Sequence, residues 1–249
     1  MTNLFKKLGL VFSVVFVFHF AHAEVLQFQE GDIIGESEID HSANTAFFEA
    51  ATGTRFGHVA VVLKVENNWY VYEETPPKAR VLELQKFLDN SPGPFAVIRK
   101  QEPLLAGQLR LVKEKAQDIV DREVPYNEFQ TAHDGYLNCS EFARAVFAAA
   151  GVNVGKIERI QDMNLATFHG YPWQLWQRIH PETKLDDQVT SPASVMRSPG
   201  WQVVMGQLDP LKKHSDQELV KAWKDENALE GVAKYWRLTV EQLEKLAEP

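Results

Sequence analysis

The first half of the chain is dominated by apolar runs of strand length, separated by short polar segments. The run from His58 to Leu63 is continuous and rich in β-branched residues, which is typical of a buried strand. A polar turn at residues 66–68 separates it from Trp69 to Tyr72, so these two strands are predicted to form a hairpin. Four more strands are predicted, around Asp32 to Ile34, at Val81 to Leu84, at Phe95 to Arg99 and at Trp201 to Met205.

Two longer segments have the spacing of amphipathic helices. Residues 106–122 form the first, and its predicted inner face consists of Leu109, Val112, Ala116 and Ile119. The clearest helix spans residues 138–150, because Asn138 is a good N-cap and Glu141, three residues later, completes a capping box. Its predicted inner face consists of Phe142, Ala145, Val146 and Ala149, and Gly151 ends it.

The pattern becomes purely helical at residues 210–249. Ser215 with Glu218, and Thr239 with Gln242, are capping boxes that each open a short amphipathic helix. We therefore interpret residues 210–249 as a helical extension of a larger domain, 24–209. A short helix is also predicted over residues 42–51, with Gly53 at its C-terminal end.

The first 23 residues have the pattern of a signal peptide. Lys6 and Lys7 precede an apolar stretch, Leu8 to Phe20, which is too short to span a bilayer comfortably. An A-x-A site ends at Ala23, so we expect cleavage there, no stable membrane anchor afterwards, and a periplasmic or secreted protein. Cleavage removes two lysines and changes the formal charge from −8 to −10. This acidic balance, without a basic patch, disfavours nucleic acid as a partner.

The single cysteine, Cys139, is unusual in an exported chain. It has no second cysteine for an internal disulfide, so it is either a reactive thiol or a small buried apolar residue. As the first residue of the capped helix, it lies where free N–H groups and the helix dipole favour a thiolate. No spacing of cysteines and histidines resembles a zinc site, and no glycine-rich phosphate loop is present. We expect neither a metal nor an organic cofactor.

A strand histidine, a carboxylate on the next strand and a thiol at a helix N-terminus together indicate a cysteine hydrolase. His58 alone is more typical of a buried core histidine; the combination with Cys139 favours catalysis. Alternation along the second strand places Glu73 and Glu74 on opposite faces, and the pattern does not decide which one meets His58. The aromatic stretch 164–176, which includes Trp173, suits either a substrate cleft or a loop packed on the core.

Several short motifs together resemble a known family. They are Gly31 to Ile34, Gly57 to Val62, Tyr70 to Glu73, Val124 to Asn127 and Cys139 to Glu141. In this order they resemble the circularly permuted NlpC-type branch of the papain superfamily, the YiiX/YebB-like proteins. The resemblance covers residues 30 to 205. It implies an α+β, permuted papain-like fold, in which an antiparallel sheet packs on the helix that bears the cysteine.

The resemblance also implies roles for three residues. Cys139 would be the nucleophile, His58 the base and Glu73 the orienting acid. The chain departs from relatives in having Gly57 before the histidine and Asn138 before the cysteine, which bears on substrate preference. The candidate substrate-binding residues are Asp32, Tyr126, Tyr136 and Trp173.

Together these features predict an exported hydrolase that cleaves an amide bond through a thioester. Its substrate would be a cell-wall peptide or a related acyl amide. Two alternatives are a lipid acyl hydrolase or acyltransferase, resembling lecithin retinol acyltransferase, and a binding protein that keeps the fold without turnover.

Overall fold

The structure is a computed structural model of the 249-residue chain. It describes residues 27–36, 51–54, 56–91, 95–127, 135–163 and 181–206, and in the tail 220–221, 224, 230, 233 and 239–246. The predicted signal peptide, most of the helix expected at 42–51, and Trp173 with the aromatic stretch around it lie outside these residues. Within the described ranges, no helix combines the length and apolar character that a membrane span requires.

One antiparallel sheet organises the molecule. Its strands are β1 (Ile33–Glu36), β2 (His58–Val65), β3 (Asn68–Thr75), β4 (Lys78–Glu83), β5 (Phe95–Lys100) and β8 (Trp201–Gly206), in the order β4-β3-β2-β1-β5-β8. The predicted hairpin is present, with a turn between Val65 and Asn68 in which Glu66 adopts a positive φ of 54°. The short β1 therefore lies between β2 and β5 in the interior of the sheet.

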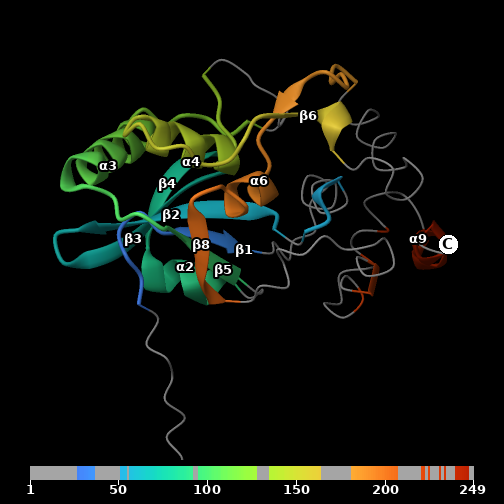
Figure 1. Ribbon diagram of the computed structural model, residues 1–249. Helices are drawn as coiled ribbons and strands as arrows, with labels where there is room; N and C mark the ends of the chain where they lie inside the picture. Colours follow the sequence, from blue (N-terminus) through green and yellow to red (C-terminus); the bar gives the residue numbers. More distant parts are fainter. Residues whose placement is uncertain are drawn as a thin grey trace, which may run out of the picture.

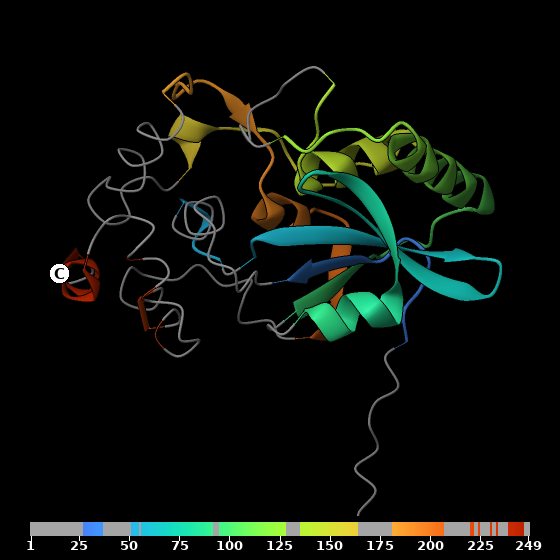
Figure 2. The same ribbon diagram turned by 180° about the vertical axis from the view of Figure 1, so that it is seen from behind.

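Helices cover both faces of the sheet (Figures 1 and 2). On one face lie α3 (Ala106–Asp121), α4 (Cys139–Ala148) and α6 (Pro192–Met196), which pack on side chains such as Val59 and Val61. On the other face α2 (Leu84–Asn90) covers Ala60, Val62 and Val71. Alternate residues of β2 thus enter two different cores, which explains why its sequence is a continuous apolar run.

Smaller elements complete the described part. Two short strands, β6 (Glu158–Arg159) and β7 (Gln188–Val189), pair with each other, and β6 runs into a 3-10 turn at Ile160–Asp162. The tail helix α9 (Val240–Leu246) begins after Thr239, whose hydroxyl accepts a bond from the Gln242 N–H. The predicted capping box at Thr239 is therefore present. The status of 210–249 as a separate extension stays a prediction.

Most element predictions agree with the structure, and four elements are corrected. β1 runs to Glu36 and β4 spans Lys78–Glu83, so both strands are longer than predicted, and Leu84 begins α2 instead of ending β4. The buried face of α4 includes Ala143 and Phe147, whereas the predicted Ala149 lies exposed beyond the helix end. The helix α6, which the sequence interpretation missed, begins where the Ser191 side chain accepts a bond from the Ser194 N–H and Pro192 supplies the first turn.

Candidate active site

His58 and Glu73 form a buried hydrogen-bonded pair at one end of the sheet. His58 is the first residue of β2, and the register that pairs Val61 with Tyr72 places Glu73 diagonally across from it on the same face. The Nε2 atom of His58 lies 2.6 Å from Oε2 of Glu73. Only 3% of His58 and 2% of Glu73 are exposed, so water hardly competes for this contact.

The neighbouring carboxylate, Glu74, points to the opposite face of β3. It is fully buried, and neither of its carboxylate oxygens has a hydrogen-bond partner in the described part of the chain. Burial, with the charge of Glu73 adding to it, raises the pKa of Glu74 to about 8. The two candidates therefore differ in environment, and Glu73 is the one that contacts His58.

Cys139 occupies the first position of α4, as the sequence predicts. Asn138 is the N-cap: its side chain accepts from the Glu141 N–H at 2.9 Å, and the Glu141 carboxylate accepts from the Asn138 N–H at 2.9 Å. Asn127 also donates to Glu141, at 3.1 Å, which holds the segment before the helix in place. The thiol is 4% exposed and lies at the end of α4 where unbonded N–H groups gather.

The imidazole of His58 links the thiol to the carboxylate. Burial alone lowers the pKa of His58, but a hydrogen bond to Cys139 and its charge, followed by those of Glu73, outweigh it. The pKa of His58 consequently lies well above its ordinary value of 6.5. Because Nε2 is bound to Glu73, Nδ1 is the ring nitrogen that remains for the thiol. A protonated imidazole beside sulfur is the arrangement that stabilises a thiolate.

Two further charged residues surround this pair, and sequence reasoning missed both. Arg80, directly opposite Glu73 on β4, donates from Nε to Oε1 of Glu73 at 2.7 Å. Burial raises the pKa of Glu73, but His58 and then Arg80 outweigh burial and hold it below 4.5. Glu36 pairs with His58 in the β1–β2 register, and burial raises the pKa of Glu36 against the charge of His58. The turn between Thr75 and Lys78 joins β3 to β4 in a hairpin, which places Arg80 opposite Glu73. That turn is the sequence feature from which Arg80 could have been found.

The remaining predicted residues are scattered. Asp32 is buried at the opposite end of β1, where Arg99 donates to its carboxylate through Nε and Nη2, each at 2.7 Å. Tyr126 and Tyr136 lie on the segment that leads into α4. The backbone of Tyr126 forms an isolated β-bridge with Leu137, and Tyr136 is 44% exposed. Trp173 falls in the part that the structure leaves undescribed. The Asp32 carboxylate is therefore paired with Arg99, and its role in substrate binding stays a prediction.

Comparison with known proteins agrees with this arrangement. Residues 27–205 match the model of a family described as permuted papain-like amidase enzymes, YaeF/YiiX, C92 family. The fold is similar to the crystal structure of the metalloprotein YiiX from Escherichia coli O157:H7. The TM-score is 0.64 at 22% sequence identity, and the match covers 73% of this chain and 98% of that chain. Among the described residues of this chain, no group of three or more His, Cys, Asp or Glu side chains is arranged so that it could hold a metal ion.

Curated protein sequences give no match to this chain. The family model, however, covers well over half of it, and the order histidine, acid, cysteine along β2, β3 and α4 is the permuted order. The expected α+β, permuted papain-like fold is therefore confirmed, and so is the class of cysteine hydrolase. The chain belongs to the C92 family of permuted papain-like amidases.

Proposed function

We propose that the protein hydrolyses an amide bond with Cys139 as nucleophile, His58 as base and Glu73 as the group that orients the imidazole. The single observation that supports these roles best is the position of His58. Its Nε2 atom lies 2.6 Å from the Glu73 carboxylate, and the nearby Cys139 thiol raises the pKa of its imidazole. A buried imidazole with these two partners has a defined orientation and an available proton.

The reaction follows from these positions. The thiolate of Cys139 attacks the amide carbon, and the carbonyl oxygen becomes an oxyanion that N–H groups at the start of α4 stabilise. His58 then gives its proton to the leaving amine as the C–N bond breaks, which leaves a thioester. Water attacks the thioester while His58 takes a proton from it, and the carboxylic acid leaves as the thiolate returns. The Glu73 carboxylate stabilises the imidazolium in both steps.

The activation of the Cys139 thiol by His58 can be tested without a known substrate, because Cys139 is the only cysteine. The alkylation rate of the full chain by iodoacetamide is measured between pH 5 and 9 for the wild type and for His58→Ala. We expect rapid alkylation well below about pH 8.5, the pKa of an ordinary thiol, and its loss in the variant. Cys139→Ser is the control that shows no labelling.

The pH profiles of alkylation, together with turnover of esters and amides, distinguish the two alternative functions. Identical profiles for the wild type and His58→Ala, with midpoints near that of a free thiol, would contradict activation and favour a binding protein. An activated thiol combined with turnover of acyl esters but not of amides would favour a lipid acyl hydrolase. The proposed substrate is a cell-wall peptide amide, since exported enzymes meet such peptides.

Export itself is a separate proposal, which rests on Lys6, Lys7 and the A-x-A site that ends at Ala23. We expect the mature protein to begin at Glu24 and to be recovered from the periplasmic or secreted fraction. Amino-terminal sequencing of that fraction provides the measurement. Membrane-bound protein that still begins at Met1 would contradict the proposal.

A further inference from the structure

Asn138, which caps α4, has one hydrogen-bonding group without a partner. Its Oδ1 atom accepts from the Glu141 N–H at 2.9 Å, so the oxygen of the side-chain amide is used by the cap. The nitrogen, Nδ2, is buried and has no hydrogen-bond partner among the described residues. Only 1% of Asn138 is exposed, so bulk water does not reach this donor. A buried N–H group without an acceptor is costly, and its presence requires an explanation.

The cap alone does not require this donor. Serine, aspartate and asparagine cap helices about equally well, because each offers a side-chain oxygen to an N–H group of the first turn. The chain itself uses Ser191 in this way at the start of α6. A serine at position 138 would supply the same oxygen and would bury no unpaired amide nitrogen. The Nδ2 group of Asn138 is therefore explained by something other than the cap.

The unpaired donor lies at the end of α4 that carries the thiol. Nδ2 is bonded to the same carbon as Oδ1, which contacts the first turn, so both atoms lie at the start of the helix. Cys139 is the next residue in the chain and the first of the helix. The first bond of the helix joins the Phe142 N–H to the Asn138 carbonyl, so the N–H groups of Cys139 and Ser140 have no acceptor within it. Backbone and side-chain donors thus gather beside the thiol.

Hydrogen bonds fix the segment that leads into this end of α4. The Asn127 N–H donates to the Leu137 carbonyl at 2.8 Å, and the Leu137 N–H donates to the Pro125 carbonyl at 3.2 Å. The Glu141 carboxylate accepts from the Asn138 N–H and from the Asn127 side chain. Donors held in this way need no rearrangement when negative charge develops beside them.

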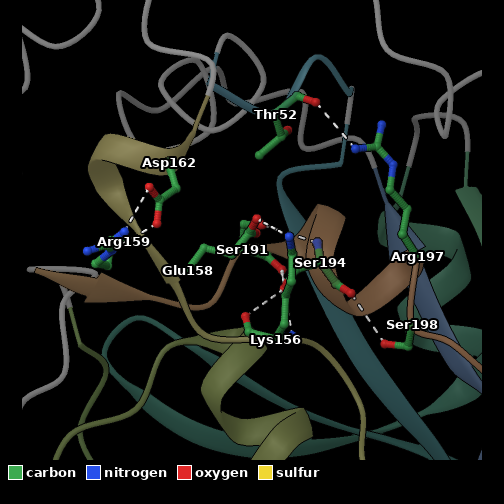
Figure 3. A network of polar contacts seen from close by, with 9 residues as sticks. All are labelled: Thr52, Lys156, Glu158, Arg159, Asp162, Ser191, Ser194, Arg197 and Ser198. Carbon is green, nitrogen blue, oxygen red and sulfur yellow. Dashed lines mark hydrogen bonds and ion pairs between the residues drawn. The ribbon is translucent and has the colours of Figure 1, made fainter. Parts of the chain in front are cut away.

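The chain that leaves α4 is tied to α6. The Gly155 N–H donates to the Ser198 hydroxyl at 2.6 Å, and the Ser194 hydroxyl donates to the Lys156 carbonyl at 3.3 Å. Figure 3 shows the link between Ser194 and Lys156, with Ser198 nearby. The helix α6 packs on α4 and also on β1 and β2. Both ends of α4 are therefore anchored to the rest of the fold, which keeps the donors at its start in a fixed position.

We propose that Asn138 is a catalytic residue whose Nδ2 donates a hydrogen bond to the oxyanion of the reaction, beside the backbone N–H of Cys139. As the sulfur of Cys139 bonds to the carbonyl carbon, the π electrons move to the oxygen, which becomes negative and accepts both N–H groups. When the C–N bond breaks, these electrons re-form the carbonyl, and the amine leaves with the proton of His58. The oxyanion thus supplies the acceptor that Nδ2 lacks. The inference rests on the proposed function, since it adds a residue to the same reaction.

Two reactions of Cys139 separate this role from a role in activating the thiol. Iodoacetamide alkylates the thiolate by displacement of iodide from a saturated carbon, so no oxyanion forms. Para-nitrophenyl acetate acylates the same sulfur through an oxyanion and releases para-nitrophenolate. Both rates are measured at one pH on the full chain, and Cys139→Ser gives the background of each. Because both rates depend on the thiolate, the ratio of acylation to alkylation reports the stabilisation of the oxyanion.

Asn138→Ser retains a side-chain oxygen for the cap and removes the Nδ2 donor. We expect the ratio to fall by roughly 10-fold to 100-fold, because the loss of one oxyanion donor typically costs about 100-fold or more in catalysis and less with an activated ester. Glu141→Gln is the matched control. It alters the same capping box, keeps an oxygen for the Asn138 N–H and leaves Nδ2 in place, so the ratio should stay unchanged.

Two results would overturn this role of Asn138. One is a ratio that Asn138→Ser leaves unchanged, including the case in which both rates fall together, because Asn138 would then act on the thiol or on the fold. The other is an equal fall of the ratio in Glu141→Gln, which would assign the loss to the capping box. In either case, alkylation at low pH that still depends on His58 leaves the catalytic pair standing. Loss of that dependence is the failure of the proposed function, and it overturns both.

Discussion

Arg80 lies opposite Glu73 in the β3–β4 pairing and contacts the proposed catalytic pair through the Glu73 carboxylate. Its Nε donates to the oxygen of Glu73 that does not face His58, so the two bonds hold the carboxylate from both sides. Because the Arg80 side chain is 52% exposed, water screens this charge-assisted bond, which contributes about 1 kcal/mol. Its loss should allow Glu73 to rotate and to take up a proton at a higher pH.

We therefore predict that Arg80→Met lowers the alkylation rate of Cys139 roughly fivefold, the equivalent of about 1 kcal/mol. The acidic limb of its pH profile should move to higher pH, because Arg80 is one of the groups that lower the pKa of Glu73. Arg80→Lys should restore part of the rate. A profile identical to that of the wild type, with folding intact, would show that Arg80 only pairs β3 with β4.

At the scale of elements, α4 combines structure and chemistry in one capped helix. The Asn138 and Glu141 box that the sequence predicts satisfies N–H groups on both sides of Cys139. The helix thereby begins with its thiol at the end of the sheet where His58 opens β2. The short α6 follows the same rule, with Ser191 as cap and Pro192 in the first turn, although its five residues are too few for a periodic apolar pattern.

At the scale of the whole molecule, the buried Glu74 should make stability depend on pH. Its pKa is about 8 in the folded protein and 4.5 ordinarily, so the folded state holds a proton that the unfolded chain has lost. The free energy of unfolding is therefore highest below pH 4.5 as far as this group is concerned. It falls as pH rises toward 8, by up to about 1.4 kcal/mol per pH unit.

We predict that Glu74→Gln flattens this dependence, so that the variant gains stability over the wild type as pH rises from 6 to 8 (roughly the window between the two pKa values). Urea unfolding at several pH values measures the difference. Glu114→Gln, at a 57% exposed side chain on α3, is the control and should follow the wild type. Parallel curves for the wild type and Glu74→Gln would mean that Glu74 ionises freely in the folded protein.

The sequence by itself determined the local structure and the residue types of the site. Caps, turns and apolar periods act within a few residues, so β2, β3, α3 and α4 could be predicted, and Cys139 could be placed at a helix start. The motifs in their order pointed to the permuted papain-like fold and hence to His58 and Cys139. The ion pair of Asp32 with Arg99 could not be predicted, because the two residues lie 67 positions apart in the chain.

Only the tertiary structure decided between Glu73 and Glu74. The choice depends on which face of β3 His58 shares, and that is set by the register between two strands and not by alternation within one. The same holds for Arg80, which meets Glu73 through the β3–β4 pairing. Contacts of this kind arise when distant elements pack, so no local pattern in the chain records them.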